Sequence, residues 1–435
     1  MSRPIPALLA TFCLFSIQYT LVTYAVVDAT EHDFSFHGYA RGGFMTSEAG
    51  ETAAEFAAPG AGAKYRLGNE SDVQLRLRLN YQYGDVATTE PYVQAEIAVE
   101  DYQRLGNSRD FTLNQVPKAW LRFGNVLADD VSFWVGRRWY KRKGSYINDY
   151  WWLNSGQKSN LGLGVEGIKL ANSELNIAVF QHRDDDAISL NSANNNTGTL
   201  KAMTLDIRLE KMVISETSQL NFWGLYADRS KHENLGYEQQ SGWGLGSWLD
   251  LTDVMGGINT LAVTYREGAA MHQSTYNAEP IRESSGYDLD NASQWEINNS
   301  WLWDDRSNYA VQWLLLARAE NYGENGVDGD TIYWYSTGAR PTLYLSQRWN
   351  VAAEFGIDYV DNEILGVQGS VEKISFALQL SPDKKFMSRP VLRFFMTYAQ
   401  WSDDLVGYVG NRPDNAPYGN DNDGWTIGTQ IEHIW

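Results

Sequence analysis

Arginine and aromatic side chains that could bind a polar ligand gather in one short part of the chain. The stretch WVGRRWYKRKGSYINDYWWLNSG, residues 134–156, holds five cationic side chains among several aromatic rings. Guanidinium groups donate hydrogen bonds in a fixed fork and aromatic rings offer flat apolar faces. Nucleic acid is a poor candidate ligand, because the formal net charge of the chain is -19 and phosphate binding needs a basic face. For Arg137, Arg138, Lys141 and Lys143 two interpretations stay open, a polyanion-binding cluster or ordinary charges balanced by the abundant Asp and Glu.

The sequence contains no set of side chains with the spacing of an enzyme or metal site. The six histidines never occur at H-x-H or H-E-x-x-H spacing, and there is no G-x-S-x-G elbow or P-loop. The acidic runs at 184–186 and 419–424 lack the full calcium-loop pattern, so solvated loops are the favoured interpretation. We therefore expect no enzyme activity, no cofactor and no metal.

The N-terminal residues have the features of a secretory signal. A basic residue precedes an apolar run, and Ala25 and Ala29 are small residues at suitable cleavage positions. Polar residues interrupt the run well before it reaches the roughly 20 apolar residues of a membrane-spanning helix. We expect a signal peptide at 1–27, cleaved between about 25 and 29, and a single barrel domain at 28–435. Cys13 is the only cysteine, so the mature protein would contain no disulfide.

Alternation of apolar and polar residues is the main structural signal in the rest of the chain. In VQLRLRLNYQY, residues 73–83, Val and Leu share one face while Gln, Arg and Asn share the other, which is typical of a β-strand. Similar runs recur at roughly 20 residues for each strand and connection. Aromatic residues occur near strand ends, for example Phe133, Trp134, Tyr398 and Trp401. We interpret them as girdles at the two membrane interfaces.

A closed barrel accounts for these runs. Because it pairs every backbone N–H and C=O with a neighbouring strand, it crosses a bilayer without helices. The chain ends in IEHIW, where Trp435 shares the parity of Ile431 and Ile427, a pattern similar to the C-terminal signature of bacterial outer-membrane proteins. The about 408 residues after the signal would form about 16 to 20 strands, enough for an aqueous lumen.

Five stretches, spread from one end of the chain to the other, resemble the maltoporin-like family of outer-membrane sugar porins, which includes maltoporin and sucrose porin. They are FSFHGYARGGF, AGAKYRLGNE, VGRRWYKRKGSYINDYWW, RPVLRFFMTYAQW and WTIGTQIEHIW. The resemblance implies an all-β fold, a homotrimer of 18-stranded antiparallel transmembrane β-barrels in the bacterial outer membrane, with the third loop folded inward. It also implies facilitated diffusion, in which sugars slide along a row of aromatic rings while charged residues opposite exchange hydrogen bonds with the hydroxyls.

The resemblance assigns residues to this mechanism. Tyr39 matches the first aromatic of the slide, Trp151 matches the constriction residue of the third loop, and Tyr344 stands beside a further slide position. The polar track would consist of Arg41, Arg66, Arg76, Arg142 and Asp149. Tyr39 and Arg41 also share the parity expected of the lumen face. On the other interpretation, Tyr39 is an interface ring and Arg66 is a solvated loop charge.

Several positions depart from the family pattern. The places of slide aromatics are taken here by Gln74, Ile258, Leu345 and Ile434. Arg76 and Gly144 stand where the family has track carboxylates. Each lost ring removes a stacking energy of roughly 1 kcal/mol, in addition to the energy from the apolar area that the ring buries. We therefore expect a saccharide channel that is not tuned to long maltodextrins and that favours a shorter or an acidic saccharide.

Other functions fit parts of the sequence. A general diffusion porin shares the barrel but lacks sugar stacking, and Tyr39, Trp151 and the charged third loop argue against it. An outer-membrane lipase would need a Ser–His pair in the barrel wall, and none is recognisable. An adhesin or phage receptor is compatible with long outer loops, and a soluble β-sandwich lectin is the non-membrane alternative.

Overall fold

The structure is a computed structural model, and it describes residues 32–47, 55–70, 72–104, 112–113, 115–157, 159–188, 197–271, 291–323, 331–410 and 418–435. The expected signal peptide, 1–27, lies outside these ranges. Helical turns in the described ranges are limited to three short 3-10 helices, η1 (Glu233–Leu235), η2 (Gly268–Ala270) and η4 (Asp403–Leu405). Across the same ranges, no helix has the length and hydropathy to cross a membrane.

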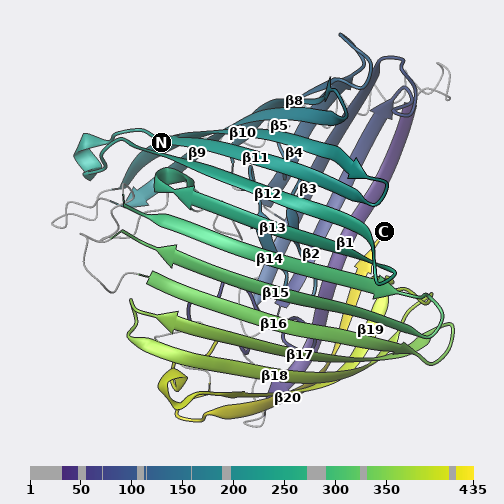
Figure 1. Cartoon of the computed structure of the whole chain (residues 1–435), viewed down its shortest axis with the longest axis vertical. Helices are drawn as coiled ribbons and strands as arrows, with labels where there is room; N and C mark the ends of the chain where they lie inside the picture. Colours follow the sequence, from purple (N-terminus) through teal and green to yellow (C-terminus); the bar gives the residue numbers. More distant parts are fainter. Residues whose placement is uncertain are drawn as a thin grey trace, which may run out of the picture.

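Eighteen strands form one closed antiparallel sheet, and Figure 1 shows them tilted and side by side around the wall. Strands that follow one another along the wall are paired, and β1 (His32–Ser47) pairs with β20 (Asp423–Ile434) to close the barrel. This closure confirms the expected all-β, 18-stranded antiparallel barrel. It leaves no free sheet edge, so the backbone of the wall is satisfied without water.

The other strands of the wall are β2 (Asp72–Tyr83), β3 (Tyr92–Arg104), β4 (Gln115–Gly124), β5 (Ser132–Arg137), β8 (Leu161–Leu170), β9 (Ser173–Ile188), β10 (Thr197–Ser215), β11 (Ser218–Arg229), β12 (Gln240–Val254), β13 (Gly257–Glu267), β14 (Ser293–Asp304), β15 (Tyr309–Asn321), β16 (Thr331–Tyr344), β17 (Trp349–Asn362), β18 (Val367–Leu380) and β19 (Val391–Trp401). A separate hairpin, β6 (Lys143–Ser145) and β7 (Tyr150–Leu153), lies in the connection between β5 and β8.

Alternate side chains point to opposite faces of the wall. On the outer face of β1, Phe44 is 70% exposed, whereas Arg41 on the lumen face is 7% exposed. Large apolar side chains on the outer surface contact the acyl chains of a bilayer, which explains the period-two pattern of the sequence. At the C-terminus, the Trp435 ring lies over Gly38 of β1, where a side chain would overlap it. Trp435 therefore lies on the outer face, as do Ile427 and Ile431, with which it shares parity.

Two of the expected girdle residues face the lumen instead. Trp134 packs against Phe180 with ring centroids 5.8 Å apart, and Trp401 is also buried inside the barrel. Their sequence neighbours Phe133 and Tyr398 occupy the outward positions. The girdle interpretation was wrong for these two tryptophans because rings that fill the lumen also lie near strand ends. Only strand parity separates the two groups.

The connection between β5 and β8 folds into the barrel. Tyr150 is fully buried, with its ring edge-on to Trp334 of β16 at 5.1 Å and its hydroxyl donating to Glu296 of β14 at 2.7 Å. Trp152 packs against Trp248 of β12 at 5.7 Å. Because these partners belong to strands far along the wall from β5, the connection crosses the lumen. The expected inward fold of the third loop is confirmed.

The segment 55–70, between β1 and β2, also lies inside. Tyr65 fits against Gly338 of β16 and Gly356 of β17, where any added Cβ would overlap its ring. Its hydroxyl makes a 3.0 Å hydrogen bond with Ser336. Two glycines facing each other on adjacent strands thus leave the room that this ring fills.

Candidate functional site

An ion-pair cluster forms where β1 meets segment 55–70. Arg41 donates from Nη1 to Glu70 at 2.7 Å and from Nε to Asp72 at 2.8 Å, and Arg66 donates from Nε to Glu70 at 2.6 Å. Burial alone would raise the pKa of Glu70, but the charges of Arg41 and Arg66 outweigh burial and lower this pKa to about 2. The carboxylate therefore stays ionised at neutral pH and fixes the segment to β1.

Glu432 of β20 extends this cluster toward the barrel closure. The Tyr39 hydroxyl donates to Glu432 at 3.3 Å, Arg66 lies 3.6 Å from the same carboxylate, and Arg393 donates to it at 2.9 Å. We call this group the β1 cluster, which consists of Tyr39, Arg41, Arg66, Glu70, Asp72, Arg389, Arg393 and Glu432. Its cations and carboxylates are closely matched.

Asp149 belongs beside the β1 cluster rather than with the other residues of its loop. It has a φ of +55°, a left-handed conformation, and its N–H donates to the Tyr146 carbonyl at 3.2 Å. Its negative charge acts on Arg66, whose guanidinium lies 4.8 Å from the Tyr146 ring. The turn therefore brings a carboxylate from the inserted connection to the lumen side of β1.

A second group is built around Arg142. Its guanidinium lies 3.9 Å from the Trp139 ring and 4.0 Å from the Trp151 ring, so it is held between two indoles of the inserted connection. Arg142 also donates to Gln157 at 3.2 Å. A planar cation between two rings gains cation–π and stacking energy on both faces. Both tryptophans remain partly exposed inside the barrel.

Strands β2 and β4 of the wall place further cations near the Trp139 ring. Arg76 of β2 lies 4.1 Å from the Trp139 ring and pairs with Glu100 of β3 at 2.6 Å, while Lys118 of β4 lies 4.8 Å from the same ring. We call this group the arginine–tryptophan strip, which consists of Arg76, Arg78, Lys118, Trp120, Arg122, Arg138, Trp139, Arg142 and Trp151. Register places its strand residues on the lumen face of β2 and β4. The strip thus lines the inner surface with alternating cations and flat rings.

A family model described as LamB porin matches residues 34–435 of the chain. The chain belongs to the LamB porin family. It is therefore a porin, a channel of the bacterial outer membrane, and the apolar outer face of its barrel is embedded in that membrane.

Several solved outer-membrane channels are similar to the chain over most of its length. The OpdK protein of Pseudomonas aeruginosa is 12% identical, with a TM-score of 0.47, and the match covers 93% of this chain and 99% of that one. The DcaP channel of Acinetobacter baumannii is 10% identical, with a TM-score of 0.45, covering 94% and 99%. Pseudomonas putida OprB is 7% identical, with a TM-score of 0.41, covering 97% of each chain. None of these likenesses bears on the selectivity of this LamB-family porin.

The expected site residues of the porin lie in two groups, except for Tyr344. Tyr39, Arg41, Arg66 and Asp149 meet at the β1 cluster, whereas Arg76, Arg142 and Trp151 meet in the arginine–tryptophan strip. Tyr344 lies apart from both. It is buried on the lumen face at the end of β16 and donates to Asp304 at 3.0 Å. Leu345 beside it points outward and is 56% exposed, so Tyr344 has the inward register of the pair.

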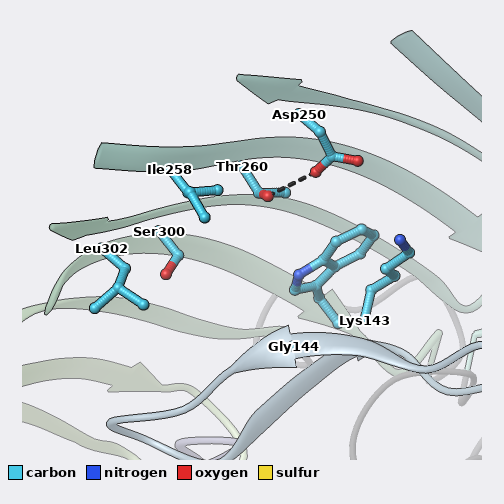
Figure 2. Close-up of a pocket in the computed structure, with 8 residues that line it drawn as sticks. Lys143, Gly144, Asp250, Ile258, Thr260, Ser300 and Leu302 are labelled. Atoms are coloured by element: carbon cyan, nitrogen blue, oxygen red, sulfur yellow. Dashed lines mark hydrogen bonds between the residues drawn. The ribbon is translucent and has the colours of Figure 1, made fainter. Parts of the chain in front are cut away.

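Two departures from the family pattern line one pocket of about 190 Å³. Figure 2 shows Gly144 of the inserted hairpin facing Ile258 of β13 across this pocket, with Lys143 beside Gly144. Thr260 donates to Asp250 at 2.7 Å within the lining. The pocket thus combines an apolar surface with polar groups next to the strip.

The sequence interpretation missed Trp139 and Trp120. Trp139 gave no signal because it lies among charged residues outside a regular strand, where parity does not indicate which way a side chain points. Trp120 carried a usable signal, since in KAWLRF it shares parity with Lys118 and Arg122, the polar side of the strand. Of the cations for which two interpretations were open, Arg138 lies in the strip, 5.0 Å from the Trp120 ring.

No group of three or more His, Cys, Asp or Glu side chains with metal-binding geometry occurs in the part of the chain that the structure describes.

Proposed function

We propose that this porin carries saccharides by facilitated diffusion along the arginine–tryptophan strip. The observation that supports this proposal is the Arg142 guanidinium lying about 4 Å from two partly exposed indole rings, Trp139 and Trp151. A pyranose has an apolar C–H face and a rim of hydroxyls. Indole faces and edges suit the first surface, and the N–H groups of arginine suit the second.

In this proposal the β1 cluster forms the polar track. Tyr39, Arg41, Arg66 and Asp149 exchange hydrogen bonds with sugar hydroxyls as the sugar passes, and Arg76, Arg142 and Trp151 act at the constriction. Because the track residues already have protein partners, each new contact replaces an existing one, and no single site holds the sugar tightly. Tyr344 contributes a ring at the turn end of β16.

The proposed substrate is not a long maltodextrin. Gln74, Ile258 and Ile434 offer no ring to stack on, so a long neutral chain would find stacking only near Trp139 and Trp151. The missing rings also favour the second candidate function, a general diffusion porin.

Liposome swelling separates the two candidates. Saccharide selectivity predicts faster swelling with a mono- or disaccharide than with a polyol of matched size. Rates that follow solute size alone would instead establish the general porin. Block of single channels by maltohexaose at micromolar concentration would contradict the proposed departure from maltodextrin specificity.

The proposed assembly is a homotrimer, formed after removal of a signal peptide at 1–27. Cross-linking of the purified porin in detergent and N-terminal sequencing test these two points. A monomer, or an N-terminus upstream of residue 25, would contradict them.

A further inference from the structure

The arginine–tryptophan strip has more positive than negative charge, although the whole chain is strongly acidic. It contains six cations, Arg76, Arg78, Lys118, Arg122, Arg138 and Arg142, and three carboxylates pair with them, Glu96, Glu100 and Glu166. The β1 cluster has four arginines and three carboxylates, with Asp149 adding a fourth. Of these two groups, only the strip has an excess of positive charge.

Each of the three carboxylates already lies within ion-pair distance of a cation of the strip. Glu96 lies 3.0 Å from Lys118. Glu166 is shared by two arginines, lying 3.3 Å from Arg122 and 3.1 Å from Arg138. A carboxylate divided between two guanidiniums leaves each of them with donors to spare, because each guanidinium has five.

Arg78 has a buried hydrogen-bond donor that is not satisfied in the described part of the chain. Its Nε is buried without a hydrogen-bond partner among the residues that the structure describes. Leaving a buried charged donor unsatisfied costs more than leaving a neutral donor unsatisfied, so the protein's own groups balance the Arg78 charge only incompletely. The neighbouring Lys118 is repelled by both Arg78 and Arg76, which shows that the three positive charges act on one another.

Ala98 stands between two of these charges, and its short side chain is buried beneath them. Arg78 of β2 pairs with Ala98 of β3, and Ala98 pairs with Lys118 of β4, all on the lumen face. Adjacent strands lie about 4.8 Å apart, so the Arg78 and Lys118 backbones are roughly 10 Å apart across one methyl group. Two long side chains at that separation can converge on a single carboxylate.

We propose that Arg78 and Lys118 form an anion subsite, and that the saccharide carried by this porin bears carboxylates. This inference rests on the proposed function and names its substrate class. The uronate carboxylate is held at the lumen ends of these two side chains, while the pyranose ring lies toward Trp120 or Trp139. Neutral sugars gain only the stacking and hydroxyl contacts.

The test uses the mature porin in planar bilayers, with trigalacturonate and maltotriose as probes of equal length. Arg78→Gln and Lys118→Gln are compared with Lys231→Gln, which removes a cation from an exposed connection. Retained heat-modifiable migration shows that each variant has folded. We expect trigalacturonate to block wild type at roughly tenfold lower concentration than maltotriose, and each strip variant to lose roughly that factor for trigalacturonate alone. Lys231→Gln should behave as wild type.

The possible results separate the two proposals. Equal block by both probes, or a preference kept in Arg78→Gln and Lys118→Gln, overturns the anion subsite while saccharide transport stands. If neither probe produces block or flux, both proposals are overturned. A preference lost equally in Lys231→Gln would show a general effect of net charge and would also overturn the subsite.

Discussion

The Trp151 ring lies directly on Gly144: a Cβ added at Gly144 would come within 2.9 Å of Trp151 Cε3. Gly144 is one of the positions at which the resemblance to the family implies a carboxylate. Its replacement is therefore linked to the placement of the constriction ring, since only a residue without a side chain lets the indole pack this closely on the β6–β7 hairpin.

Gly144→Asp should displace Trp151 rather than restore a working track carboxylate. The new side chain overlaps both the ring and the backbone of the facing strand. We expect single-channel conductance to change and sugar discrimination to fall. Thr89→Asp is the control, because Thr89 is exposed in the connection between β2 and β3. Wild-type conductance and wild-type sugar block in Gly144→Asp would contradict the idea that Gly144 is needed for the position of the Trp151 ring.

Trp151→Ala should widen the constriction. Removing the indole opens space beside Arg142 and takes away one of its two stacking partners. We expect higher ion conductance and weaker discrimination between sugars of different size, measured by single-channel recording and liposome swelling. If both quantities keep their wild-type values, the inserted connection does not form the neck of the pore.

The barrel was predictable from sequence because its physics is local. An outward residue must be apolar and an inward residue polar, so Phe44 and Arg41 reveal the strand and its faces without any knowledge of the partners. The lumen packing was not predictable in the same way. Trp134 and Trp401 are apolar yet face inward, because the inserted segments give the lumen an apolar core of its own.

The site was predictable only in part for a related reason. Tyr39 and Arg41 lie on a regular strand, where parity and motif agree. Trp139 and Asp149 lie in an irregular connection, where the left-handed turn at Asp149 decides which wall each side chain meets. Such contacts depend on how the whole connection crosses the lumen, and a local pattern does not encode that path.

Glu70→Gln should destabilise the barrel interior and remove part of its acid sensitivity. The variant leaves Arg41 and Arg66 buried with one partner fewer, and breaking a buried pair costs about 3 to 5 kcal/mol. Since the pKa of Glu70 is lowered to about 2, its stabilisation is fully present above the ordinary carboxyl pKa near 4.3. This stabilisation is lost as the pH falls from there toward 2.

Thermal unfolding in detergent at pH 7 and pH 3 measures both effects. Wild type should lose more stability than Glu70→Gln over this range. Asp253→Asn changes an exposed residue near the end of β12. Its stability should match that of wild type at both pH values. An equal acid-induced loss in wild type and Glu70→Gln would contradict a stabilising role for the Glu70 charge.

Arg142 allows charge and planarity to be separated at the constriction. Arg142→Lys keeps the positive charge but loses the flat group that fits between Trp139 and Trp151, whereas Arg142→Ala loses both. We expect both variants to discriminate less between sugars, because the spacing of the rings depends on the guanidinium. Only Arg142→Ala should shift the reversal potential in a KCl gradient toward weaker anion preference. If Arg142→Lys keeps the wild-type sugar block, the positive charge alone accounts for sugar discrimination at the constriction. If Arg142→Ala keeps the wild-type reversal potential, Arg142 does not face the ion path.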